Sequence, residues 1–178
     1  LHMESLGKKT KIDGNPVNVN TGNVIWGGSG SDGQHSYFQL LHQGTYTIPI
    51  DFIVDAGVSD DHMDTYSLAN CLAQSESLMA GIQEADPERS IDGDKPNNVI
   101  FVNKLSPQSI GQLVALYEHK VFVQSIIYGI NAFDQYGVEL GKKIAQSLSK
   151  VISKSSRYTG KNPSTRALLS KIREYKKG

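Results

Sequence analysis

Three glycines in this sequence have the spacing of a turn that binds phosphate groups. Gly28, Gly30 and Gly33 match the pattern G-x-G-x-x-G, and a short apolar run at residues 24–26 precedes them. A strand that leads into such a turn, with a helix after it, is typical of dinucleotide-binding folds, because glycine lets the backbone approach a pyrophosphate closely. The spacing therefore permits a nicotinamide-dependent oxidoreductase as one interpretation of the chain.

The residues after these glycines both support and oppose that interpretation. Asp51 and Asp55 follow Gly33 by 18 and 22 residues, close to the spacing of the acid that binds a ribose in such folds. However, Asp51 falls inside the predicted strand at residues 48–54 rather than at its end. His35 also places an imidazole where a phosphate-binding turn needs small side chains. The alternative is a glycine-rich turn that brings the backbone close to another group.

Two histidines, His35 and His42, are seven residues apart and would face nearly the same way on a helix. Such spacing can hold a metal, but no third ligand follows with the spacing of a zinc site. The lone Cys71 gives no disulfide framework and fits a reducing compartment. We therefore expect neither a metal site nor a disulfide.

Apolar patterning predicts an α/β fold in which strands alternate with helices. Short apolar runs predict buried strands at residues 24–26, 48–54 and 98–102. Ser106 and Pro107 have the residue types that begin a helix, and the helix after them is apolar over most of its circumference, which predicts a central position. Helices between strands require crossover connections, so we expect a parallel sheet flanked by helices, with a C-terminal helical tail. The predicted helices cover residues 34–43, 62–82, 106–123 and beyond, about 138–154, and 165–177.

The overall composition limits the classes of protein to consider. With 178 residues, 38% apolar and 20% charged, the chain has the size of one domain or the larger part of one. Eighteen basic and eighteen acidic residues balance, so nonspecific nucleic-acid binding is not expected. No apolar stretch approaches the roughly 18 residues of a membrane span, so no membrane partner is expected. The N-terminal residues do not have the pattern of a signal peptide. The chain starts at Leu1, and Met3 is a poor start, which predicts a piece of a longer protein.

The charges are unevenly distributed along the chain. Residues 51–94 contain eleven acidic residues and one basic residue, whereas residues 142–178 contain eleven basic residues and one acidic residue. Such runs are usually solvated faces. The alternative is a basic tail that lies on an acidic surface, either its own or that of a partner.

Three segments together resemble the motifs of glucose-6-phosphate isomerases, the phosphoglucose isomerase family. They are MESLGK at residues 3–8, GQHSYFQLLHQG at residues 33–44 and GINAFDQYGVELGK at residues 129–142. Shorter matches lie between them, LAQSE at residues 72–76 and YEHKVFVQ at residues 117–124. The resemblance runs through the whole chain in order and corresponds to roughly the C-terminal third of the family's length.

The resemblance implies an aldose–ketose isomerase that interconverts glucose 6-phosphate and fructose 6-phosphate in glycolysis and gluconeogenesis, without a metal or an organic cofactor. It also implies a fold of the sugar-isomerase (SIS) type, which agrees with the parallel sheet expected from the patterning. We assign residues 1–154 to the C-terminal part of such an enzyme, including most of one SIS-type domain, and residues 155–178 to a C-terminal helical arm. The family is further expected to be a cytoplasmic homodimer whose active-site histidine is supplied across the interface.

The resemblance assigns roles to four residues. Glu4 corresponds to the base that moves a proton between adjacent carbons through an enediol, a role that suits a carboxylate because it can return the proton it takes. His35 and Lys142 correspond to residues that open the sugar ring, and Gln135 corresponds to an amide that contacts the substrate. All four are therefore candidate substrate-binding residues, and Glu4, His35 and Lys142 are the candidate catalytic residues.

Two other functions stay open at the level of the sequence. One is a regulatory domain that keeps the fold and binds a sugar phosphate without turnover. The other is the oxidoreductase built on Gly28, Gly30 and Gly33. The family's phosphate-binding Ser/Thr loop and its active-site arginine have no counterpart in these 178 residues, so we expect this chain alone to be inactive.

Overall fold

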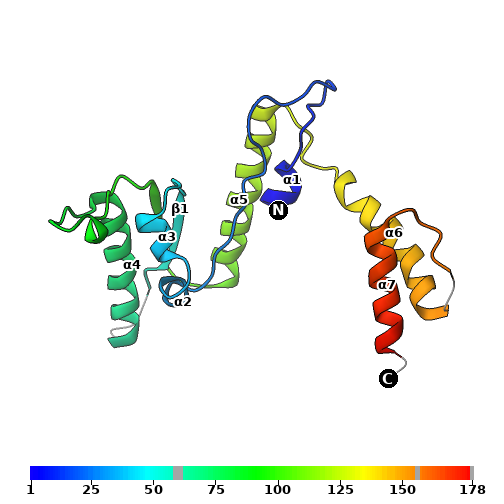
Figure 1. Ribbon diagram of the computed structural model, residues 1–178. Helices are drawn as coiled ribbons and strands as arrows, with labels where there is room; N and C mark the ends of the chain where they lie inside the picture. Colours follow the sequence, from blue (N-terminus) through cyan, green and yellow to red (C-terminus); the bar gives the residue numbers. More distant parts are fainter. Residues whose placement is uncertain (58–61, 155–156, 177–178) are drawn as a thin grey trace.

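The computed structural model describes residues 1–57, 62–154 and 157–176. Figure 1 shows a long helix, α5, in the middle of the chain, with the sheet and α4 on one side and α6 and α7 on the other. Within the described ranges, no helix is both long enough and apolar enough to cross a membrane. The elements are α1 (His2–Leu6), α2 (Gly30–Gln34), α3 (Phe38–Gln43), β1 (Ile50–Asp55), α4 (His62–Ala80), η1 (Pro87–Arg89), β2 (Asn97–Val102), α5 (Pro107–Tyr128), α6 (Tyr136–Lys154) and α7 (Pro163–Tyr175).

A parallel pair of strands forms the sheet of this part of the protein. β1 and β2 pair in register from Ile50 opposite Asn97 to Asp55 opposite Val102, and α4 lies between them in the sequence. Parallel neighbours need such a crossover, which is usually a helix. The structure therefore confirms the predicted α/β class, with a parallel sheet flanked by helices and a C-terminal helix.

The strand predicted at residues 24–26 is wrong. These residues form no strand, and their side chains are exposed, with Val24 at 76% and Trp26 at 45%. A strand needs a neighbour to pair with, and no described strand lies along this run. Trp26 instead packs edge-on against the ring of Tyr37, with 6.0 Å between ring centroids.

The helix predicted at residues 34–43 is interrupted. α2 ends at Gln34 and α3 begins at Phe38, and the hydroxyl of Ser36 between them donates to the Asp32 and Gly33 carbonyls at 2.9 and 3.3 Å. A serine that binds nearby carbonyls competes with the helical backbone, which explains the break. The other predicted helices correspond to α4, α5, α6 and α7.

Local capping accounts for where two of these helices begin. Ser106 caps α5 by accepting from the Ser109 backbone amide at 3.2 Å, and Pro107 follows as the first helical residue, as predicted. Asn162 caps α7 in the same way through the Thr165 amide at 3.0 Å. The predicted boundary between the SIS-type part and the C-terminal arm lies between residues 154 and 155. Residues 155–156 lie outside the described residues, so this boundary stays a prediction.

Two small apolar clusters replace a single core. The first contains Leu6 from α1, Val121 from α5 and Ile130, which follows α5. The second contains Phe38 and Leu41 from α3 and Leu78 from α4. Most of α5 is not covered by either cluster, although it lies in the middle of the chain (Figure 1). Its position agrees with the prediction, whereas its burial within this chain does not.

A polar junction joins the sheet to α5. Asp51 on β1 accepts hydrogen bonds from the Asn98 amide at 2.8 Å and from the Tyr117 hydroxyl at 3.0 Å. The ammonium of Lys120 lies 3.3 Å from the same carboxylate. Burial acts to raise the pKa of Asp51, but these three hydrogen bonds outweigh it and leave that pKa below its usual value. Burial and the hydrogen bond to Asp51 raise the pKa of Tyr117 to about 12, so this hydroxyl keeps its proton at neutral pH.

The junction should stabilise the fold only while Asp51 is ionised. Because its pKa is lower in the folded state, its contribution is fully present above the unfolded pKa of about 3.9 and is lost as the pH falls through the folded value. We expect the free energy of unfolding of the full-length protein to fall less steeply in acid for Asp51→Asn than for the unchanged protein. Urea denaturation at a series of pH values from about 5 to 2 measures this slope.

Glu76→Gln is the matched control for this prediction. Glu76 is an exposed carboxyl on α4, and its removal should leave the acid slope unchanged. If Asp51→Asn and the unchanged protein lost stability in parallel as the pH fell, the junction would not contribute through its charge.

Candidate active site

Glu4 lies on α1, a helix of one turn. Its side chain is exposed, whereas Leu6, two residues later, is fully buried against Val121 and Ile130. This burial fixes α1 on α5. The Glu4 carboxylate therefore projects into solvent from an anchored turn.

Lys8 connects this turn to a segment more than a hundred residues away. Its ammonium donates to the Ser5 carbonyl at 2.6 Å and to the Glu4 carbonyl at 3.4 Å. The same ammonium lies 3.7 Å from a carboxylate oxygen of Asp134, which immediately precedes Gln135. The structure thus brings the backbone of Glu4 and the segment of Gln135 onto one side chain.

Gln135 and Lys142 lie at the start of α6. The Gln135 amide donates to the Phe133 carbonyl at 3.2 Å, within a turn that the Asn131 side chain closes by accepting from the Phe133 backbone amide at 3.0 Å. Gln135 immediately precedes α6, and Lys142 lies in the second turn of that helix. Both side chains are exposed, so each is accessible to a ligand.

His35 lies apart from these residues, in the turn between α2 and α3. Its side chain is exposed and makes no hydrogen bond or ion pair with the part of the chain that the structure describes. The adjoining α3 belongs to the cluster of Phe38 and Leu78, whereas α1 belongs to the cluster of Leu6. Figure 1 places α2 and α1 at different levels along α5. The chain therefore does not bring His35 to Glu4.

The glycine pattern at residues 28–33 does not have the surroundings of a dinucleotide site. No strand precedes it, and Asp51, which would have bound a ribose, is already bound at the junction with α5. An added methyl group would meet no protein atom within 4 Å at Gly28 or Gly30, so the packing of the protein itself does not require glycine there. The structure gives the nicotinamide alternative no support.

The side chain of His42 is held by a hydrogen-bond contact within the protein. Its Nε2 atom lies 2.9 Å from the Gln74 side-chain oxygen, which joins α3 to α4. Among the residues with described positions, no three histidine, cysteine, aspartate or glutamate side chains cluster closely enough to hold a metal ion.

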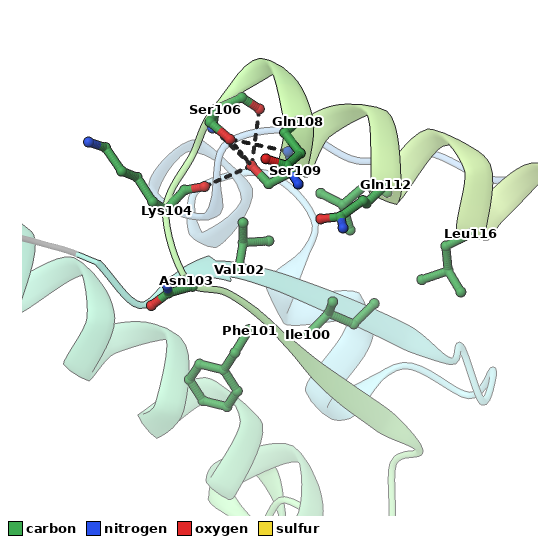
Figure 2. Close-up of a pocket in the computed structure, with 11 residues that line it drawn as sticks. Ile100, Phe101, Val102, Asn103, Lys104, Ser106, Gln108, Ser109, Gln112 and Leu116 are labelled. Atoms are coloured by element: carbon green, nitrogen blue, oxygen red, sulfur yellow. Dashed lines mark hydrogen bonds between the residues drawn. The ribbon is translucent and has the colours of Figure 1, made fainter.

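A hollow of about 430 Å³ lies where β2 ends and α5 begins (Figure 2). Ile100 and Val102 point toward α5 there, while Phe101 points to the other side of the sheet, as alternation along a strand requires. The cap of Ser106 and Ser109 forms one end of the hollow. None of the four residues predicted from the sequence lines this hollow, so it is separate from the candidate site.

Comparison with known proteins identifies the family. A family model described as phosphoglucose isomerase matches residues 1–169. The chain belongs to the phosphoglucose isomerase family. A glucose-6-phosphate isomerase from Xanthomonas oryzae pv. oryzae is 49% identical over 175 residues, which cover 97% of this chain and 34% of that protein. One from Pseudomonas fluorescens is 45% identical over 201 residues, which cover 100% of this chain and 36% of that protein.

Solved structures of similar proteins agree with the family assignment. The crystal structure of a glucose-6-phosphate isomerase from Chlamydia trachomatis matches with a TM-score of 0.81 and 35% identity, over 98% of this chain and 34% of that one. A hypothetical protein from Thermus thermophilus matches with a TM-score of 0.62 at 22% identity, over 83% of this chain and 36% of that one, and supports the fold alone. This member of the phosphoglucose isomerase family spans about a third of the length of the relatives it matches.

Sequence reasoning missed the connection made by Lys8 and Asp134. Both residues fall within the family motifs at residues 3–8 and 129–142, so their types were visible. Nothing in the spacing indicates that the two motifs meet, because the contact depends on how α1 docks on α5.

Gly33 and Gly28 allow a direct test of which glycine is required. A methyl group on Gly33 would lie 2.8 Å from the Tyr37 hydroxyl and 2.9 Å from a ring carbon of Phe38, which the apolar cluster holds in place. We expect Gly33→Ala to lower the free energy of unfolding by about 1–3 kcal/mol in urea denaturation of the full-length protein. Gly28→Ala is the control and should cause no loss, since the site is open. Equal losses at both positions would contradict the packing described here.

Proposed function

We propose that this chain is part of an aldose–ketose isomerase that interconverts glucose 6-phosphate and fructose 6-phosphate. The observation that carries the proposal is the match of residues 1–169 to the phosphoglucose isomerase family, with the candidate site residues inside the matched region. The relatives named glucose-6-phosphate isomerase support the same substrate pair. We place the reaction in glycolysis and gluconeogenesis in the cytoplasm.

Glu4 is the base in this proposal. The reaction moves a proton between neighbouring carbons, and an exposed carboxylate on an anchored turn can take the proton from one carbon and return it to the other. A positioned acid–base group of this kind contributes about 10²–10⁴-fold to the rate. No metal or organic cofactor is needed for such a transfer.

His35, Lys142 and Gln135 complete the proposed site. An imidazole donates and accepts protons near neutral pH, which suits the opening of the sugar ring. Lys142 assists that step and places positive charge near the oxygen on which negative charge develops. Gln135 lies beside Asp134 and contributes an amide that can donate to and accept from sugar hydroxyls.

The protein acts as a homodimer in this proposal, with His35 supplied to Glu4 of the second copy. The separation of the two apolar clusters supports this arrangement, since α1 packs in the first cluster and the α3 that follows His35 packs in the second. The remaining two thirds of the relatives' length would provide the phosphate-binding loop and the arginine. We therefore propose that these 178 residues are inactive alone, and that residues 155–178 form an arm on the neighbouring copy.

The first test is Glu4→Gln in the full-length enzyme. This change removes the base but keeps the size of the side chain, so we expect kcat to fall by about 10²–10⁴-fold while the affinity for sugar phosphate changes little. Coupled assays of isomerisation and calorimetric titration measure the two quantities. Glu84→Gln, an exposed carboxyl in the loop before η1, is the control. Normal turnover in Glu4→Gln would instead show that Glu4 is not the base of the reaction.

The second test asks whether His35 acts across the interface. If it does, a dimer of one Glu4→Gln copy and one His35→Ala copy contains one intact site, although both parent proteins are inactive. Statistical mixing during co-expression should then restore about a quarter of the unchanged activity. If both residues came from the same copy, neither site of the mixed dimer would be intact. Absence of any recovery in purified mixed dimers would therefore contradict the shared site.

A further inference from the structure

We propose that Lys8 is a positioning residue for the isomerase reaction, because it holds the turn that carries Glu4 against the segment that carries Gln135. This inference rests on the proposed function and goes beyond it by assigning a role to a residue that does not touch the substrate. Three contacts of one ammonium group, two to α1 and one to Asp134, carry the argument.

The contacts of Lys8 supply hydrogen-bond donors to carbonyls at the end of α1. The last carbonyls of any α-helix have no partner within the helix, and in a helix of one turn these form most of its hydrogen-bonding groups. Lys8 donates to two of them, those of Ser5 and Glu4, at 2.6 and 3.4 Å. A lysine near the C-terminal end of a helix also interacts favourably with the helix dipole.

The ion pair with Asp134 fixes where this turn lies. The side chains of Lys8 and Asp134 are only 15% and 23% exposed, so the pair is less screened by salt than a surface pair would be. Asp134 adjoins Gln135, and Ile130 of the same segment is buried against Leu6. The apolar contact and the ion pair therefore hold α1 and the Gln135 segment together at two points.

The backbone of Lys8 is held as well as its side chain. The Thr21 hydroxyl donates to the Lys8 carbonyl at 2.6 Å, and the Lys8 amide donates to the Leu6 carbonyl at 2.7 Å. The backbone at Gly22 lies so close to that of Gly7 that a methyl group on Gly22 would meet the Gly7 Cα at 2.4 Å. Lys8 is therefore held at its backbone as well as at its ammonium, which bridges α1 and Asp134 from a fixed position.

The consequence for catalysis is a fixed relation between the base and the substrate-binding amide. A displacement of a catalytic group by about 1 Å can cost on the order of 10²-fold in rate. Loss of Lys8 should therefore lower kcat more than it raises KM, since Glu4 and Gln135 remain present but are no longer held in their relation.

The experiment compares Lys8→Met and Lys8→Arg with Lys9→Met in the full-length enzyme. Lys9 is the exposed neighbour and serves as the matched control. We expect kcat to fall about 10–100-fold for Lys8→Met with less than a threefold change in KM, and to recover partly for Lys8→Arg, whose guanidinium can still donate to a carbonyl and to Asp134. Lys9→Met should match the unchanged enzyme. Rates are measured well below the unfolding midpoint of each variant.

Asp134→Asn provides a second variant that keeps the size of the side chain while it removes the ion pair. Asp134→Asn should also lower kcat with little change in KM. Its kcat should fall less than that of Lys8→Met because the two hydrogen bonds from Lys8 to the carbonyls of α1 persist. Lys8→Met with the kcat of Lys9→Met, or Lys8→Arg no better than Lys8→Met, would overturn the positioning role. An unchanged enzyme without isomerase activity would instead overturn the proposed function, so the two failures are distinguishable.

Discussion

The burial of Leu6 against Val121 and the hydrogen bonding of Asp51 to Tyr117 act on the same turn of α5, since Tyr117 and Val121 are four residues apart and share a face of the helix. One turn of one helix therefore holds both α1 and the sheet. Lys120, on the same turn, forms an ion pair with Asp51. Burial lowers the pKa of His2 on α1, and the positive charge of Lys120 lowers it further. The relative placement of the Glu4 turn and the sheet depends on this short stretch.

Predictions from the sequence were correct where the cause is local. Ser106 with Pro107 begins a helix because a hydroxyl next to the first turn satisfies a free amide, and this requires no distant residue. The prediction at residues 24–26 failed because a strand depends on a neighbour that the apolar run itself cannot specify. The family motifs predict which residues belong to the site, but they do not indicate that Lys8 and Asp134 meet.

The exposed surface of α5 explains why the chain has two small clusters rather than one core. Ile126 is 64% exposed and Ile127 is 75% exposed, and apolar residues occur around the whole helix. A helix that is apolar on every side is typical of the interior of a larger protein. This agrees with a chain that spans about a third of the length of its relatives.

The first apolar cluster also has a consequence for the order in which the protein is made. Leu6 leaves the ribosome long before Val121 and Ile130, which form the surface it is buried against. Because the ribosome adds about 5–20 residues per second, the residues that pack against Leu6 are synthesised on the order of ten seconds after α1. The contact of α1 with α5 therefore forms only after α5 has been synthesised, so the docking of the segment with the proposed base onto α5 is a late step of folding during synthesis.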